Sequence, residues 1–283
     1  MKIVITGSEG QLGRELMKLY PTAIGASHCP SKANYLPIEH PPLIEKFLKE
    51  VNPDIVINAA ALTNVDMCER EKKYAYQVNA LAVRAISVVC NDIGARLVQI
   101  STDYVFDGLD GNYLEDSPPN PVNYYGLTKL SGEQFALANE NNTIVRTSGV
   151  FGYSNNFPLF VYNKLKNKEP VNAIKGYYSP IHAKNLALAI QKLISFDFNG
   201  EIINVAGDRI SRFELALRIA EYFNFDNDLV KESEQITNMQ AKRPFDSSLN
   251  IENAKSLIDF DFYSIKTNLY ALKESISSTE KIK

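Results

Sequence analysis

The stretch Lys2–Gly13, KIVITGSEGQLG, indicates the fold class. Lys2–Thr6 is rich in β-branched residues, as in a buried strand, and Gly7 ends it. Three leucines then recur at helical spacing over residues 12–19 until Pro21 stops the pattern. A strand, a glycine turn and a helix in this order predict the first unit of a parallel α/β sheet.

The same alternation continues along the first half of the chain. Further strands are expected over residues 22–27, 35–38, 54–61, 96–102 and 143–148, and helices over 43–51, 74–93 and 123–138. Apolar strands joined by helices indicate a parallel sheet that is covered on both faces. The expected fold class is therefore α/β, with a doubly wound parallel sheet.

The second half alternates less regularly. Helices are expected over 157–166 and 183–194, strands over 171–174 and 201–205, polar loops over 224–248 and a frayed tail over 277–283. Ser211 and Glu214 have the spacing of a capping box that opens a helix to about residue 223. We expect residues 1–150, completed by elements within about 171–205, to form the sheet domain. Residues 151–170 and 206–283 would form a smaller C-terminal substrate-binding subdomain.

Composition excludes several classes of protein. The 30 Lys and Arg nearly balance the 33 Asp and Glu, for a net charge of −3, and no basic cluster suits nucleic acid. The three cysteines, Cys29, Cys68 and Cys90, lack the spacing of a metal site, so no metal is expected. No apolar run is long enough for a membrane span or a signal segment. We expect a soluble cytoplasmic protein.

The glycine turn is typical of a dinucleotide site. Glycines 7, 10 and 13 would let the backbone approach a pyrophosphate at the N-terminus of the following helix. The acid that usually binds the ribose 2′-hydroxyl about 20 residues later is missing, and Ser27 and Lys32 stand there instead. These residues favour NADP, with NAD left open because Lys32 can equally be an ordinary solvated residue.

Tyr125 and Lys129 form the second chemical signal. Their spacing of four places them on one face of a helix, where the ammonium would lower the pKa of the phenol. Thr102 ends one strand and Ala59–Ala61 end another, both at the carboxyl edge of the sheet where α/β folds bind ligands.

Together these segments resemble the extended short-chain dehydrogenase/reductases, and more narrowly their dTDP-4-dehydrorhamnose reductase branch. The supporting segments are the glycine turn, residues 58–66 (NAAALTNVD), 101–108 (STDYVFDG), 121–133 (PVNYYGLTKLSGE), 146–148 (RTS) and the pair Arg243-Pro244. They cover the first 150 residues densely and the remainder thinly. The resemblance implies a Rossmann fold that binds NADP.

The resemblance also carries over roles, residue by residue. Thr102 matches the catalytic hydroxyl, Tyr125 the general acid, and Lys129 the residue that tunes the phenol and holds the nicotinamide ribose. Asn79 matches a position that assists the lysine through a water. The cofactor-binding set implied is Gly7, Gly10, Gln11, Leu12, Gly13, Ser27, Lys32, Ala59, Ala60, Ala61, Asn79, Tyr125 and Lys129.

The activity implied is NADPH-dependent reduction of the C4 ketone of a nucleotide-linked 4-keto-6-deoxy sugar, as in dTDP-L-rhamnose biosynthesis. The expected partner is a dTDP-linked keto-sugar, and members of the family often form homodimers. Arg243 is the candidate for binding the phosphates, with a surface loop residue as the alternative. Asp103 would either contact substrate or accept backbone N–H bonds at the strand end.

Two departures keep other functions open. Gly149 stands where the branch usually has Trp, and residues 175–181 (KGYYSPI) differ from the family pattern. A non-catalytic NADP(H)-binding regulatory subunit, resembling the β subunit of methionine adenosyltransferase, is therefore one alternative. A nucleotide-sugar epimerase or dehydratase is another, although dehydratases carry Asp-Glu after the threonine and this chain has Asp103-Tyr104.

Overall fold

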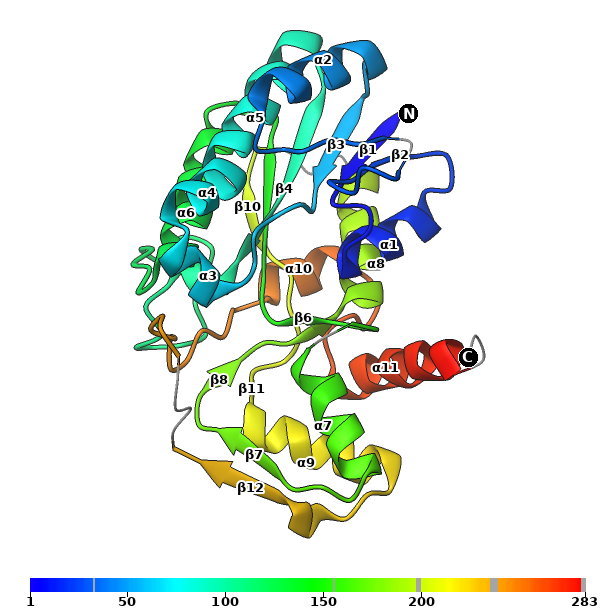
Figure 1. Ribbon diagram of the computed structural model, residues 1–283, viewed down its shortest axis with the longest axis vertical. Helices are drawn as coiled ribbons and strands as arrows, with labels where there is room; N and C mark the ends of the chain where they lie inside the picture. The colour runs from blue at the N-terminus through cyan, green and yellow to red at the C-terminus, as the bar shows by residue number, and fades with distance from the viewer. Residues whose placement is uncertain (33, 155, 197–199, 235–238, 281–283) are drawn as a thin grey trace.

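A six-stranded, all-parallel sheet forms the centre of the computed structural model, which describes residues 1–32, 34–154, 156–196, 200–234 and 239–280 (Figure 1). Its order is β10-β5-β4-β3-β1-β2. The strands are β1 (Ile3–Thr6), β2 (Ile24–Ala26), β3 (Ile55–Asn58), β4 (Arg96–Thr102), β5 (Thr143–Thr147) and β10 (Ile202–Asn204). Since β2 and β3 flank β1, the winding reverses between β1 and β3, which is where ligands bind in such sheets.

Helices cover both faces of this sheet. On one face α1 (Gln11–Leu19) and α8 (Ala183–Ser195) pack on a core that includes Leu16, Ile57 and Ile190. On the other face α2 (Pro41–Val51), α5 (Ala82–Ile93) and α6 (Tyr124–Leu137) enclose a second core. The doubly wound α/β class predicted from the sequence is confirmed.

A smaller lobe lies at the carboxyl edge of the sheet, in the lower half of Figure 1. Its helices are α7 (Phe157–Lys166), α9 (Arg212–Phe223) and α11 (Ile265–Glu280), and its strand pairs are β7 (Val171–Ile174) with β12 (Val230–Ser233) and β8 (Tyr177–Tyr178) with β11 (Ile210–Ser211). They share a separate apolar core. The short pair β6 (Val150–Phe151) and β9 (Ile181–His182) and helix α10 (Glu252–Leu257) complete the described elements.

Four local expectations differ from the structure. Residues 35–38 form no strand but a single bridge between Ser27 and Tyr35, and within them Leu36 and Ile38 pack in the core. The polar segment 224–248 contains β12, although residues 235–238 lie outside the described residues. The expected tail is helical to Glu280 in α11, and residues 281–283 also lie outside the described part.

The fourth difference is the helix expected over 74–93. It divides into α4 (Lys72–Tyr76), a π-helical turn (Gln77–Leu81) and α5, and the short helix α3 (Val65–Arg70) precedes it. Asn79 in the π turn accepts a hydrogen bond from the Leu62 N–H and donates one to the Leu62 carbonyl. The Asn79 amide in this turn thus binds the loop after β3. Such π turns are frequent at functional sites.

A buried ion pair fixes α6 against the sheet. Arg146 on β5 donates from Nε to Glu133 Oε1 at 3.0 Å and from Nη2 to Oε2 at 2.8 Å, and both side chains are buried. Ser101 on β4 donates to the same carboxylate. Tyr125, Lys129 and Glu133 are spaced four residues apart on α6, so this pair also orients the face that carries the two residues singled out by sequence.

We expect Glu133→Gln to lower the free energy of unfolding by about 3–5 kcal/mol, because it leaves the Arg146 guanidinium buried without a countercharge. Urea denaturation measures the change. The matched control is Arg218→Gln, which removes an exposed ion pair with Glu221 and should cost less than about 1 kcal/mol. Equal losses in the two variants would contradict the anchoring role of Glu133.

Candidate active site

Two cavities meet at the carboxyl edge of the sheet. One of about 320 Å³ lies beside β2, and one of about 580 Å³ lies over the ends of β4 and β5. Gly10, Ala59 and Ala61 line both of them. The cavities therefore form the two halves of one elongated groove that crosses the point between β1 and β3 where the winding reverses.

The glycine turn forms the middle of this groove. Gly7 has a φ of +66°, and a Cβ on Gly13 would lie 2.1 Å from the Gly7 carbonyl oxygen, so the turn requires glycine at both positions. No side chain caps the N-terminus of α1, and its first turn carries no acid. The free N–H groups and the positive end of the helix dipole fit a pyrophosphate. The residues present thus suit the dinucleotide predicted from the sequence.

The smaller cavity suits the adenosine half of a dinucleotide. Ser27 lines it and is buried, and its hydroxyl accepts the Cys29 N–H at 3.1 Å. Lys32 is not among the lining residues, and its ammonium is 3.6 Å from Glu9. Glu39, which sequence reasoning did not select, also lines the cavity. Glu39 stands farther along the chain from the glycine turn than the acid that usually binds the ribose.

The larger cavity contains the three predicted catalytic side chains. Thr102 at the end of β4 and Tyr125 and Lys129 on α6 all line it, together with Gln11 and Leu12 of the glycine turn. The Tyr125 phenol lies beside the Thr102 hydroxyl. The structure thus brings together the hydroxyl, the phenol and the ammonium that the resemblance selected.

Burial controls the pKa values of this group. Burial raises the pKa of Tyr125, and the nearby Asp103 raises it further, while the Thr102 hydroxyl opposes them. Burial also lowers the pKa of Lys129 to about 8, although the negative charge of Glu133 acts to raise it.

The expectation that Lys129 lowers the pKa of the phenol is wrong for this structure. The lysine Nζ donates to the Ile100 carbonyl at 2.7 Å, so the cost of burying the Tyr125 phenolate dominates. A raised pKa keeps Tyr125 protonated near neutral pH, as a general acid requires.

Asp103 connects three segments beneath the cavity. Its Oδ1 accepts from Thr102 Oγ1 at 3.0 Å, and its Oδ2 accepts from Ser148 Oγ at 2.7 Å and Ser247 Oγ at 2.6 Å. Burial raises the pKa of this carboxyl. Both oxygens already have partners, so the clearest role of Asp103 is to orient Thr102.

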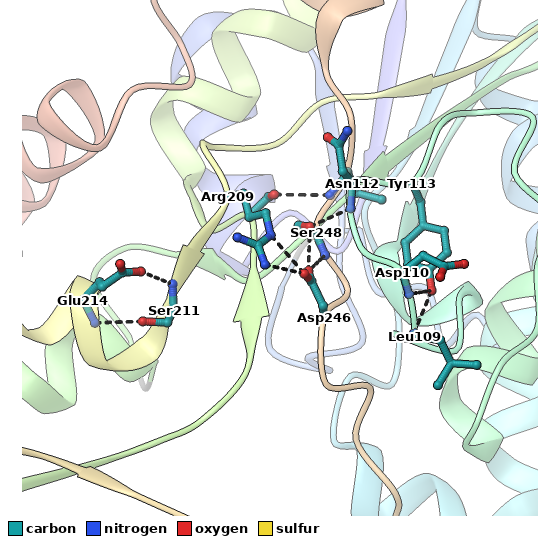
Figure 2. A network of polar contacts seen from close by, with 11 residues as sticks. Leu109, Asp110, Asn112, Tyr113, Arg209, Ser211, Glu214, Asp246 and Ser248 are labelled. Atoms are coloured by element: carbon teal, nitrogen blue, oxygen red, sulfur yellow. Dashed lines mark hydrogen bonds and ion pairs between the residues drawn. The ribbon is translucent and has the colours of Figure 1, made fainter.

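A polar network fixes Asp246 and Ser248, the residues on either side of Ser247 (Figure 2). Arg209 donates to Asp246 Oδ2 from Nε at 2.9 Å and from Nη2 at 2.7 Å, and Ser248 Oγ donates to Asp246 Oδ1 at 2.6 Å. The Asn112 N–H in turn donates to Ser248 Oγ at 2.7 Å. The segment that carries Ser247 is therefore attached both to the smaller lobe and to the loop after β4.

Asn79 takes a structural position. Besides Leu62, its amide donates to Thr128 Oγ1 on α6 at 3.1 Å, and it is not among the residues lining either half of the groove. It therefore fixes the loop that follows Ala61 against the helix that carries Tyr125.

Two arginines of the C-terminal part of the chain lie near Tyr104, which lines the larger cavity, but neither arginine is among the residues that line it. Arg243 is 3.2 Å from Asp66 and donates to the Ala241 carbonyl at 2.9 Å. Arg212 stacks over the Tyr178 ring at 4.6 Å and lies near Tyr104. Both charges oppose the rise in the Tyr104 pKa that burial causes. Sequence reasoning missed Arg212, whose only signal is its place directly after the capping residue Ser211.

Tyr178 occupies the space left by Gly149. A Cβ on Gly149 would lie 2.7 Å from a ring carbon of Tyr178, so the ring stands where a side chain at residue 149 would begin. The departure from the family pattern at residue 149 is thus matched by an aromatic side chain from β8, within the divergent segment 175–181.

Among the described helices, none is long and apolar enough to span a membrane.

Comparisons with known proteins agree with this geometry. The family model described as RmlD substrate binding domain matches residues 1–278. Spore coat polysaccharide biosynthesis protein SpsK of Bacillus subtilis is 32% identical over 254 residues, which are 88% of this chain and 89% of that protein.

Two crystal structures described as dTDP-4-dehydrorhamnose reductases are also similar. The hypothetical one from Sulfolobus tokodaii has a TM-score of 0.88 and 48% identity, covering 93% of this chain and 97% of that one. The one from Bacillus anthracis, in complex with NADP, has a TM-score of 0.86 and 31% identity, covering 96% and 97%. The chain belongs to the RmlD substrate binding domain family, the dTDP-4-dehydrorhamnose reductase-like branch of the NAD(P)-dependent short-chain dehydrogenase/reductases.

Proposed function

We propose that this protein uses NADPH to reduce the C4 ketone of a nucleotide-linked 4-keto-6-deoxy sugar. The observation that carries the proposal is the buried phenol of Tyr125, which lines one cavity with Thr102 and Lys129 next to the glycine turn that suits a dinucleotide. A ketone reduction needs a proton donor of this kind at the carbonyl oxygen. The NADP named with the Bacillus anthracis structure supports the choice of cofactor.

The side chains divide the work of the reaction. The nicotinamide, when bound, supplies the hydride. Tyr125 gives its proton to the carbonyl oxygen as negative charge develops there, and Thr102 holds the phenol in place. Lys129, fixed by the Ile100 carbonyl, presents an ammonium to the cofactor ribose and to the phenolate that remains.

The smaller lobe supplies the groups for the nucleotide. We assign the diphosphate to Arg243 and Arg212, which approach Tyr104 from residues 206–283, the segment proposed to bind substrate. Arg243 already has an ion-pair partner in Asp66, whereas the described residues give Arg212 no ion pair, although its charge interacts with that of the buried Asp103. A guanidinium whose N–H groups have no carboxylate partner is the better anion site.

The nucleotide and sugar are proposed on family grounds. The dTDP-reductase names attached to similar structures support a dTDP-linked substrate, and the name of SpsK points to a polysaccharide pathway. Elimination chemistry has less support, because the position after Asp103 holds the partly buried Tyr104 where a dehydratase would have a glutamate.

Tyr125→Phe should reduce kcat/KM by at least about 100-fold while leaving NADPH affinity nearly unchanged, because it removes only the proton donor. NADPH oxidation with a dTDP-4-keto-6-deoxy sugar, with substrate omitted in the control, measures this. A wild-type protein that binds NADPH but turns over no keto-sugar would contradict the reductase assignment and favour a regulatory subunit.

Arg212→Gln should raise KM for the nucleotide sugar about tenfold or more, because it removes a charged partner of the diphosphate. The matched control is Arg218→Gln. Arg218 lies on the same helix as Arg212, but its side chain is exposed and its charge is paired with Glu221. Steady-state kinetics should show little change in KM for the control, and equal effects would contradict a diphosphate site at Arg212.

Activity should fall as pH rises through about 8, where Lys129 loses its ammonium. Stability should respond in the opposite sense. The pKa of Lys129 is lowered in the folded protein from 10.5 to about 8, so between these values the unfolded chain binds more protons and stability rises with pH. A pH profile of kcat/KM, with melting temperatures at the same pH values, separates the two effects. The activity of Lys129→Met should not fall as pH rises through about 8. A fall in kcat/KM that persists in this variant would show that another group titrates.

A further inference from the structure

Thr147, the last residue of β5, has a buried hydroxyl without a partner. The residue is 5% exposed, and within the described chain no atom makes a hydrogen bond to its Oγ1. It lines the larger cavity, over the same sheet edge as the catalytic group. A buried hydroxyl that lacks a partner costs roughly 1–3 kcal/mol, so most such groups in proteins are paired.

The register of the sheet places Thr147 beside Thr102. The two residues are directly paired between β5 and β4, so their side chains share one face of the sheet on strands about 5 Å apart. Their hydroxyls differ in what they can offer. Thr102 gives its proton to Asp103 and accepts the Tyr104 N–H, whereas the proton of Thr147 is uncommitted.

The neighbours of Thr147 are engaged elsewhere. Arg146 is paired with Glu133, while Ser148 donates to Asp103 and accepts the Ser179 N–H at 3.2 Å. Local structure therefore satisfies the residues on both sides of Thr147 but not Thr147 itself. Oγ1 itself is buried, so a ligand in the cavity that Thr147 lines reaches the hydroxyl by a rotation about the Cα–Cβ bond that turns Oγ1 toward the cavity.

We propose that Thr147 is a ligand-binding residue, whose hydroxyl donates a hydrogen bond to a ligand oxygen beside the reacting carbon. This inference rests on the proposed function, since that function puts a keto-sugar and a nicotinamide in the cavity. The ligand atom that accepts this hydrogen bond is a carbonyl or hydroxyl oxygen. It belongs either to the sugar or to the carboxamide of the nicotinamide.

The test compares Thr147→Val, which keeps the shape and removes the hydroxyl, with Thr147→Ser, which keeps the hydroxyl. Calorimetry measures the Kd for NADPH and for dTDP-rhamnose. We expect the Val variant to bind one of them about five- to tenfold more weakly, and the Ser variant to bind it nearly as the wild type does. Weaker NADPH binding identifies the carboxamide as the source of the oxygen, and weaker dTDP-rhamnose binding identifies the sugar.

Melting temperatures give a readout that needs no ligand. Thr147→Val should melt at or above the wild-type temperature, because it removes an unpaired polar group, whereas Ser148→Ala should melt lower, because its hydroxyl is bonded on both sides.

Unchanged binding of both ligands by Thr147→Val, or a lower melting temperature of that variant, would overturn the inference. A wild-type protein without keto-sugar turnover would refute the proposed function instead, and the NADPH titration and the melting temperatures would still decide the role of Thr147.

Discussion

The buried ion pair between Arg146 and Glu133 is the constraint on which the site depends. It joins β5 to α6 through two charge-assisted hydrogen bonds, and Ser101 adds β4 to the same carboxylate. Two turns earlier on the same helix face stands Tyr125, with Lys129 between them. The position of the proton donor over the sheet edge is thus set by an interaction about 12 Å of helix away.

Asp103 performs the corresponding task for the second lobe. Its carboxylate collects hydroxyls from the ends of β4 and β5 and from the segment that carries Ser247. The Arg209–Asp246 network then ties that segment to the start of α9 (Figure 2). The buried Asp103 carboxylate therefore links the Thr102 hydroxyl, beside the Tyr125 phenol, with the part of the chain that supplies Arg212 and Arg243.

Burial is what makes these groups suited to reduction. It raises the pKa of Tyr125, so the phenol holds its proton, and it lowers the pKa of Lys129 to about 8, so the ammonium lies close to its titration point near neutral pH. The same burial leaves Thr147 without a partner. A ligand that fills the cavity can regain that cost as binding energy.

Features that depend on neighbours in sequence were predictable, and those that depend on distant contacts were not. The glycine turn, the Tyr125–Lys129 spacing and the capping box at Ser211 are local patterns, and the parallel sheet follows from the alternation of strands and helices. Four other features join residues about 17 to 108 positions apart in the chain. They are the contact of Asn79 in the π turn with Leu62, the fit of Tyr178 against Gly149, the approach of Arg212 to Tyr104 and the register of Thr147 beside Thr102. Sequence by itself determined the fold class, because the alternation of strands and helices is written in short-range spacing, and its resemblance to a family selected Thr102, Tyr125 and Lys129 as the proposed catalytic group. Tertiary structure alone decided the direction of the Tyr125 pKa and the polar groups left free for a ligand, because desolvation and hydrogen-bond pairing depend on what the folded chain packs around each side chain.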